Sequence, residues 1–207
     1  MSDFSDRSDA RGLRLPEGCR IAVLASGGGT NLQALVDAYP EEVAVVAGDR
    51  AGAYAFERAR TAGIPVEHVA PDGSGNREGY DSELADRLAR YDVSLVVGAG
   101  YMRLLSGKFL ARFPATINVH PSMLPEFKGL GAVERVLEAG VPQTGVTVHY
   151  VTEEVDSGPV ILQEGLSVRP DDTLESLMER IRPVEHRLLV EAVRMHFRER
   201  LTDGPPG

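Results

Sequence analysis

The fold class follows from one stretch of this 207-residue chain, Arg20-Ile-Ala-Val-Leu-Ala-Ser-Gly-Gly-Gly-Thr-Asn31. Residues 21–25 are all apolar, and a short run without polar alternation is typical of a strand buried on both faces. Glycines follow directly, and the pattern of Asn31–Tyr39 predicts a short helix that ends at Pro40. A buried strand, a tight turn and a helix in this order predict the first unit of a parallel sheet.

The same alternation of short apolar runs and helical patterns continues along the chain. Further strands are predicted at 43–47, 65–70, 93–99 and 116–119, and further helices at 53–62 and 78–91. A strand pair is then predicted at Gly145–Val151 and Val160–Val168, followed by a helix from Thr173 to Phe197 with a break at Pro183. The order predicts an α/β fold, with a doubly wound, mostly parallel sheet flanked by helices, a C-terminal strand pair and a closing helix.

Composition limits the domain organisation and the kinds of partner. A single domain is expected over 19–201, with a flexible extension at 1–18 and a flexible tail at 202–207, because neither end carries a buried pattern. The chain has 22 Lys and Arg against 31 Asp and Glu, a net charge of −9. Binding to phosphate backbones requires a basic surface, so we expect no nucleic-acid partner.

Cysteine content and hydropathy indicate the compartment. The one cysteine, Cys19, cannot form an internal disulfide, and no apolar run approaches the ~18–20 residues of a membrane-spanning helix. The first residues are polar and acidic, unlike a secretory signal or a transit peptide. We therefore expect a cytoplasmic protein without a membrane partner.

The glycine run Ser26-Gly-Gly-Gly-Thr-Asn31 could hold an anion, most simply a phosphate. Glycines leave backbone amides bare, and a helix N-terminus carries partial positive charge. A tight turn without a ligand explains the run equally well. The run lacks the Gly-Lys-Ser/Thr of a P-loop, and Leu32 stands where a dinucleotide fingerprint has its third glycine. Asp49 matches the acid that binds ribose in dinucleotide enzymes, so a nicotinamide site is disfavoured but stays open.

Asn118 and His120 are the residues with the clearest chemical meaning. They stand two apart in Thr116-Ile-Asn-Val-His-Pro-Ser-Met-Leu-Pro125, so on a strand both side chains point to the same side. An amide donor beside an imidazole is what the oxyanion at a reacting carbonyl requires. A histidine satisfied by local structure is the simpler alternative.

Asp156 is the carboxylate that we expect beside His120. It precedes Ser-Gly-Pro in a turn, and a carboxylate there would raise the pKa of the imidazole and favour its cation. With His149, these residues could also ligate zinc or iron, but their spacing is not diagnostic, and no metal is predicted. We expect His149 to be a packed residue or one that contacts the site residues from behind.

The segment Tyr101-Met-Arg-Leu-Leu-Ser106 follows the strand predicted at 93–99. Arg103 in an otherwise apolar loop suits a flat aromatic ligand that carries a carboxylate. The alternative is a buried turn from which Arg103 reaches out to solvent. Arg77, at the start of the helix predicted at 78–91, is either a second anion contact or a surface charge.

Together these segments resemble one family, the phosphoribosylglycinamide formyltransferases of purine biosynthesis, which use 10-formyltetrahydrofolate. The resemblance extends from residue 20 to about residue 195. The segments that carry it are Ala25-Ser-Gly-Gly-Gly-Thr-Asn-Leu-Gln33, Gly100-Tyr-Met-Arg-Leu-Leu-Ser106, Ile117-Asn-Val-His-Pro-Ser-Met-Leu-Pro125, Thr144-Gly-Val-Thr-Val-His149 and Asp156-Ser-Gly-Pro-Val-Ile-Leu-Gln163.

The resemblance implies an enzyme that transfers the formyl group of 10-formyltetrahydrofolate to the primary amine of glycinamide ribonucleotide. The products are formylglycinamide ribonucleotide and tetrahydrofolate, in de novo purine biosynthesis. Both partners are then small molecules, no metal is needed, and a homodimer is one of the oligomeric states that the sequence allows. The implied catalytic residues are Asn118, His120 and Asp156; Gly29, Thr30 and Asn31 bind the substrate phosphate; Arg77, Met102, Arg103, Leu104, Leu105 and Asn118 bind folate; and Glu185 contacts the substrate amine.

Two features depart from the family pattern. Gly131 stands where many members carry a histidine, and Arg182-Pro183 interrupts a helical segment that is usually free of proline. The second departure bears on Glu185, because a break at Pro183 would change where Glu185 lies.

Three other functions remain as alternatives. Formyltetrahydrofolate deformylase shares the Asn, His and Asp set, but that family carries a further N-terminal domain and typically a second histidine where this chain has Pro121. Methionyl-tRNA formyltransferase needs an RNA-binding domain and a basic surface, which the net charge of −9 opposes. From another class, a catalytically silent module could bind a nucleotide through residues 26–31 alone.

Overall fold

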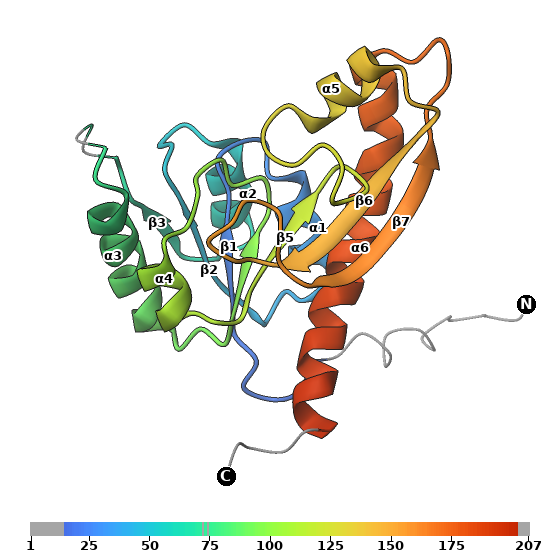
Figure 1. Ribbon diagram of the computed structural model, residues 1–207. Coiled ribbons are helices and arrows are strands. Elements are labelled where there is room, and N and C mark those ends of the chain that lie inside the picture. The colour runs from blue at the N-terminus through green and yellow to red at the C-terminus, as the bar shows by residue number, and fades with distance from the viewer. Residues whose placement is uncertain (1–14, 72, 74, 203–207) are drawn as a thin grey trace, which may run out of the picture.

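The computed structural model of the chain describes residues 15–71, 73 and 75–202. Its centre is a seven-stranded sheet in the order β3-β2-β1-β4-β5-β6-β7, with helices on both faces (Figure 1). The strands are β1 (Ile21–Leu24), β2 (Val43–Gly48), β3 (Val66–His68), β4 (Leu95–Gly98), β5 (Thr116–His120), β6 (Gln143–Tyr150) and β7 (Val160–Ser167). The helices are α1 (Thr30–Ala38), α2 (Tyr54–Thr61), α3 (Arg77–Leu88), the 3₁₀ turn Ala89–Tyr91, α4 (Gly107–Arg112), α5 (Ala132–Ala139) and α6 (Leu174–Thr202).

The strand order places the ligand-binding edge of the sheet. Strands β1 to β5 run parallel, and β6 and β7 continue the sheet antiparallel, so the fold class predicted from the sequence is confirmed. The order reverses between β1 and β4, because β2 and β3 lie on one side of β1 while β4 and β5 lie on the other. Doubly wound sheets bind ligands at this reversal, beyond the carboxyl ends of the strands. The glycine run leaves β1 there, and residues 99–105 leave β4 beside it.

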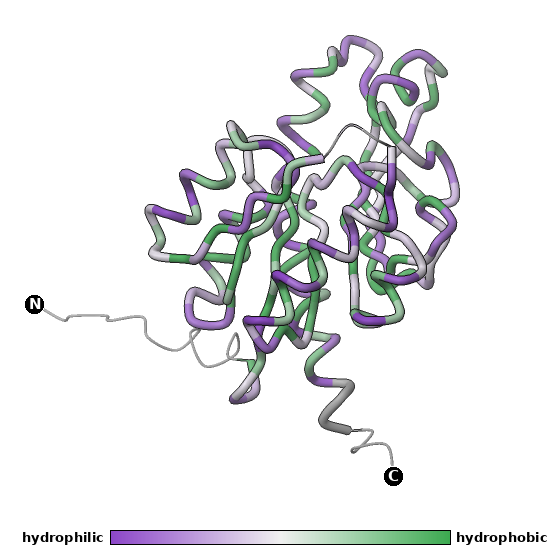
Figure 2. The backbone as a smooth tube through the Cα atoms, turned by 90° about the vertical axis from the view of Figure 1, so that its left-hand side faces the viewer, coloured by the Kyte–Doolittle hydropathy of each residue, from purple (hydrophilic) through white to green (hydrophobic). Residues whose placement is uncertain are grey.

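Alternate residues of the central strands enter two separate apolar layers. Ile21 and Val23 pack into the layer formed with α1, α2, α5 and α6, whereas Ala22 and Leu24 pack into the layer formed with α3 and α4. Hydrophobic stretches accordingly lie along the strands at the centre, and hydrophilic ones lie mainly in the outer helices and loops (Figure 2). Burial on both faces explains why these strands show no polar alternation in the sequence.

Two short helices, α4 and α5, were not predicted. Helix α4 is six residues long and begins after Ser106, whose hydroxyl accepts from the amide of Phe109 at 3.5 Å. Helix α5 begins after Gly131 and ends before Gly140, both with positive φ, and it buries Val133 and Val136. Short helices of this kind are fixed by tertiary packing, because isolated helices of such length are unstable in water.

The predicted break at Pro183 is wrong, because α6 runs through it without interruption. Proline removes one helical hydrogen bond and normally kinks the helix. Here Pro183 and Glu179 are both exposed, so the carbonyl that loses its partner faces water. On the opposite face, Leu177, Ile181 and Leu188 are buried on both sides of the proline and hold the helix against the sheet.

The two ends of the chain are only partly described. Residues 1–14 of the predicted extension and 203–207 of the predicted tail lie outside the described residues, and Leu15 packs into the core. The predicted domain limits therefore stay a prediction. In the described parts of the chain, no helix combines the length and the apolar character that crossing a membrane requires.

Candidate active site

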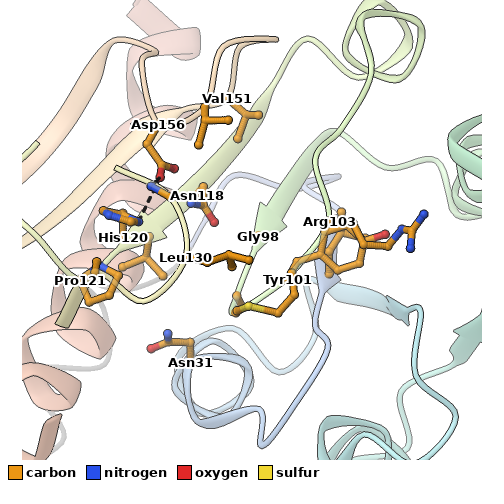
Figure 3. A pocket seen from close by; sticks show the side chains of 18 of the residues that line it. Asn31, Gly98, Tyr101, Arg103, Asn118, His120, Pro121, Leu130, Val151 and Asp156 are labelled. Carbon is orange, nitrogen blue, oxygen red and sulfur yellow. Dashed lines mark hydrogen bonds and ion pairs between the residues drawn. The ribbon is translucent and has the colours of Figure 1, made fainter. Parts of the chain in front are cut away.

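A cavity of about 770 Å³ lies at the carboxyl ends of β1, β4 and β5. Six segments that are far apart in the sequence form its wall, and they come from both halves of the chain. They are Leu24 with residues 27–31, residues 98–105, Thr116 with 118–121, residues 129–132, His149 with 151–156, and Met178, Arg182 and Glu185 of α6. Figure 3 shows Asn118, His120 and Asp156 grouped on one side, Arg103 and Tyr101 on the other, and Asn31 below them.

The glycine run is held in place by α2. Ala55 donates its amide to the carbonyl of Gly27 at 3.0 Å, and the Nε of Arg58 donates to the carbonyl of Gly28 at 2.9 Å. Gly29 has a φ of 70°, and a Cβ there would lie 2.7 Å from the Cα of Ala55, so only glycine fits. Helix α1 starts directly afterwards without a side-chain cap, and residues 27–31 line the cavity. The amides at this end of the cavity suit an anionic group.

Asn118 and His120 both line the cavity, as period-two geometry predicts. Ile117 and Val119, their neighbours on β5, belong to the apolar layer of the other face of the sheet, and Val119 also borders the cavity. Gly98 of β4 pairs with Asn118, and a Cβ on Gly98 would lie only 2.6 Å from the Asn118 Oδ1. The glycine thus leaves the room that the amide side chain occupies.

His120 and Asp156 meet, as the sequence predicts, although they lie on different elements. The His120 Nδ1 is 3.3 Å from the Asp156 Oδ2, and Asp156 comes from the turn between β6 and β7 (Figure 3). The His120 Nε2 donates to the carbonyl of Phe127 at 2.9 Å, and the amide of Gly129 donates to the Asp156 Oδ2 at 2.7 Å. The loop that follows β5 therefore contacts both side chains.

The charge state of His120 differs from the expectation. Burial lowers its pKa below the ordinary value of 6.5, although the Phe127 carbonyl and Asp156 act in the opposite direction. The predicted rise is therefore wrong, because a 6%-exposed imidazole loses more hydration than one carboxylate restores. Burial alone would raise the pKa of Asp156, but the contact with His149, the bond from the Gly129 amide and the nearby imidazoles hold it at about 2. At neutral pH the pair is a neutral imidazole beside a carboxylate.

His149 contacts the carboxylate oxygen of Asp156 that His120 does not contact. Its Nε2 is 3.4 Å from the Asp156 Oδ1, and its Nδ1 donates to the carbonyl of Tyr150 at 2.8 Å. The side chain is buried on β6, where it pairs with Asn118 across the sheet. His149 is therefore a buried residue that contacts Asp156 and also borders the cavity.

The segment after β4 forms a largely apolar wall around one cation. Met102 and Leu104 are about half exposed, at 48% and 51%, and Leu105 is buried. The guanidinium of Arg103 stacks on the ring of Tyr80 at 4.2 Å, and the hydroxyl groups of Tyr80 and Tyr101 are 2.9 Å apart. An apolar surface with a stacked cation fits a flat aromatic ligand that bears negative charge.

Glu185 lies at the glycine-run end of the cavity, despite the proline two residues earlier. Burial raises its pKa to about 7, while a hydrogen bond with the Asn31 side chain and the charge of Arg182 act to lower it. A carboxyl group with this pKa can change its charge when a ligand arrives at neutral pH.

A family model described as formyl transferase matches residues 19–193. The chain belongs to the formyl transferase family.

Individual relatives agree with this family. The phosphoribosylglycinamide formyltransferase of Haemophilus influenzae is 41% identical over 175 residues, which is 82% of each protein. The trifunctional purine biosynthetic protein adenosine-3 of Bos taurus is 40% identical over 87% of this chain, which spans only 18% of that relative's length. A solved structure of glycinamide ribonucleotide transformylase 1 from Symbiobacterium toebii has a TM-score of 0.85 and 48% identity, covering 91% of this chain and 90% of its own. The resemblance predicted from the sequence is therefore confirmed.

The cavity brings together nearly all the residues that the sequence singled out. Arg77 is the exception, since it is exposed at the start of α3 and is not among the residues of the wall. Sequence reasoning missed the contributions of Leu130, which is 74% exposed, and of Arg182. Arg182 could have been found, because it lies one helical turn before Glu185 on the same face. Leu130 offers no such signal, because its location depends on how the loop after β5 folds.

Proposed function

We propose that the chain transfers the formyl group of 10-formyltetrahydrofolate to the primary amine of glycinamide ribonucleotide, in de novo purine biosynthesis. The products are formylglycinamide ribonucleotide and tetrahydrofolate. The observation that carries the proposal is the convergence of Asn118, His120 and Asp156 on a cavity with an anion-binding end and an apolar end. The printed names of relatives of matching length, phosphoribosylglycinamide formyltransferase and glycinamide ribonucleotide transformylase, support this choice of substrates.

The two ends of the cavity fit the two substrates. The phosphate would bind at Gly29, Thr30 and Asn31, with Arg182 as the neighbouring cation and Glu185 facing the polar part of the ribonucleotide. The folate would lie along residues 102–105 and against the exposed Leu130, with its negative charge near Arg103. In this arrangement the formyl carbon and the amine meet beside Asn118 and His120.

The chemistry then follows from charge. The amine attacks the formyl carbon, a new carbon–nitrogen bond forms, and negative charge develops on the formyl oxygen, to which Asn118 donates its amide. The proton released by the amine passes to the His120–Asp156 pair, where the carboxylate stabilises the imidazolium. The pair returns this proton to the departing folate nitrogen as its bond to the formyl carbon breaks. One carbon–nitrogen bond forms, one breaks and the proton is passed on, so none of these steps requires a metal ion.

A formyl-transfer assay with both substrates tests the proposal. The His120→Ala variant should lose ~10²–10⁴ in kcat, the usual contribution of a positioned general acid–base group. His68→Ala, on β3 and outside the wall of the cavity, is the matched control and should keep its activity. Undiminished activity of His120→Ala would refute the mechanism, and formate release without the amine substrate would favour formyl hydrolysis instead.

The compartment, domain limits and partners that we propose are those expected from the sequence. We propose a cytoplasmic enzyme of one domain, residues 19–201, that acts on two small molecules and has no nucleic-acid or membrane partner. A homodimer remains one of its allowed states.

A further inference from the structure

Residues 127–129, which we call the 127–129 turn, contact both His120 and Asp156. The carbonyl of Phe127 accepts from the His120 Nε2 at 2.9 Å, and the amide of Gly129 donates to the Asp156 Oδ2 at 2.7 Å. The first bond sets the direction of the imidazole, and the second sets the position of the carboxylate. A movement of the turn would therefore displace both members of the pair together.

The turn has a backbone conformation that needs support. Phe127 has a φ of 54° and Gly129 a φ of 81°, both in the left-handed region. A bulky residue such as phenylalanine occupies this region at a cost, and it persists only where surrounding contacts compensate. Lys128, between them, donates from its Nζ to the Ser157 Oγ at 2.5 Å, a contact at a partly exposed side chain. Lys128 also lies 3.7 Å from the Glu154 Oε1, but neither contact involves a main-chain carbonyl of the turn.

Arg135 holds those carbonyls. One terminal nitrogen of its guanidinium lies 3.0 Å from the carbonyl oxygen of Phe127, 2.5 Å from that of Lys128 and 3.4 Å from that of Gly129. The side chain is partly buried, and its Nε is buried without a hydrogen-bond partner among the described residues. The hydrogen bonds of this guanidinium are thus directed to the main chain of the turn.

The helix behind Arg135 is itself firmly anchored. Val133 and Val136, on either side of Arg135 in α5, are buried in the apolar layer beneath the sheet. The Arg135 amide also bonds to the carbonyl of Gly131, where the loop enters the helix. A rigid element thus reaches the 127–129 turn through one side chain.

We propose that Arg135 is a positioning residue for formyl transfer, which holds the 127–129 turn so that His120 and Asp156 keep their geometry. The expected effect of Arg135 on kcat rests on the proposed function. Its effect on the positions of His120 and Asp156 does not. Arg135 touches neither substrate nor the reacting atoms, since it is not among the residues of the cavity wall.

Kinetics of Arg135→Met and Arg135→Lys provide the first test. Methionine keeps the apolar stem, so kcat should fall roughly 10- to 100-fold, as small misplacements of catalytic groups do. The KM for the ribonucleotide should stay within about two-fold, because the glycine run is held by α2 and not by α5. Lysine can still donate to the carbonyls and should restore part of kcat.

Arg180→Met is the matched control. Arg180 is also partly buried, has a buried Nε without a partner among the described residues, and donates to a main-chain carbonyl, that of Ser167, but it lies outside the cavity wall. It should lose stability without losing kcat. An equal loss of kcat in both variants, or none in Arg135→Met, would overturn the proposal.

Nitrogen-15 NMR of the ligand-free protein gives a test that does not depend on the reaction. In Arg135→Met the ring-nitrogen resonances of His120 should shift, because its bond to the Phe127 carbonyl is disturbed, while those of His68 should not. Unchanged His120 resonances would refute the positioning role. If the wild-type protein proved inactive in formyl transfer, a His120 shift would still support the role, so the two failures are distinguishable.

Discussion

The charge states of buried side chains such as Glu185 depend on how the folded chain surrounds them. The sequence indicates that a carboxylate stands late in the chain, but its pKa of about 7 arises from burial against residues far from it in sequence. The same holds for His120, whose neutral state follows from desolvation that no motif encodes. By contrast, the shared direction of Asn118 and His120 could be predicted, because it needs only the period of a strand.

The substitution Glu185→Gln should stabilise the ligand-free protein at pH 8. The folded-state pKa is raised from 4.5 to about 7, so the carboxyl group favours folding below pH 4.5, and this contribution is lost as the pH rises to about 7. Glutamine has no charge to bury, and the gain should reach about 2–3 kcal/mol at pH 8 and vanish near pH 4. Urea denaturation at both pH values measures it. Glu138→Gln, on an exposed part of α5, should show no such dependence, and an equal gain at both pH values would contradict the explanation.

The substitution Gly98→Ala should reduce activity more than stability. The added Cβ would lie 2.6 Å from the Asn118 Oδ1, a side-chain atom that can move, while the nearest main-chain atom of β5 is 3.5 Å away. Displacing the amide donor should lower kcat roughly 10- to 100-fold. The check is kcat together with thermal unfolding, with Gly52→Ala as control because its Cβ meets nothing within 4 Å. Full activity in Gly98→Ala would mean that the Asn118 side chain does not need the space that the missing Cβ of Gly98 leaves.

Among the secondary-structure elements, the long and strongly patterned ones could be predicted and the short ones could not. The strands at the centre of the sheet follow from continuous apolar runs. Helices α4 and α5 escaped prediction because their six and eight residues are stabilised by packing rather than by their own sequence. Helix α5 did carry a signal, an apolar spacing between Gly131 and Gly140. The loop before it offered none, although it positions His120 and Asp156.

Helix α6 should become more stable when Pro183 is replaced by alanine. Proline in a helix interior removes a hydrogen bond. Helix α6 forms despite Pro183, but the protein still loses the free energy of that bond. Restoring the amide at this exposed position should raise the free energy of unfolding by about 1–3 kcal/mol. Urea denaturation measures the change, with the exposed Glu179→Ala in the same helix as control. A destabilised Pro183→Ala would show that the helix geometry at Arg182 and Glu185 depends on the proline.

For the whole molecule, the fold class and the edge of the sheet that carries the site were both predictable. They need only the order of strands and helices and the rule that ligands bind where the strand order reverses. The cavity itself was not predictable, because its six wall segments meet only after the chain has folded. Arg77 illustrates the limit, since it lies outside the wall of this cavity and its contact with folate stays a prediction.

The domain should unfold in a single transition, and bound glycinamide ribonucleotide should shift that whole transition to higher temperature. The cavity is lined by residues from 24 to 185, so its occupant stabilises elements from both halves of the domain. At a concentration of 100 times Kd, glycinamide ribonucleotide should raise the free energy of unfolding by about 2.7 kcal/mol. Thermal unfolding, followed by calorimetry and by circular dichroism, tests this. Two transitions, of which only one responds, would contradict a single domain over 19–201.

The placement of α6 also has a consequence during synthesis. The ribosome delivers the glycine run early, but Arg182 and Glu185, which complete that end of the cavity, are among the last residues of the domain to emerge. A nascent chain therefore exposes the glycine run before the residues of α6 that complete this end of the cavity are present. Stabilisation by the ribonucleotide should therefore act on the finished domain rather than on intermediates that still lack α6.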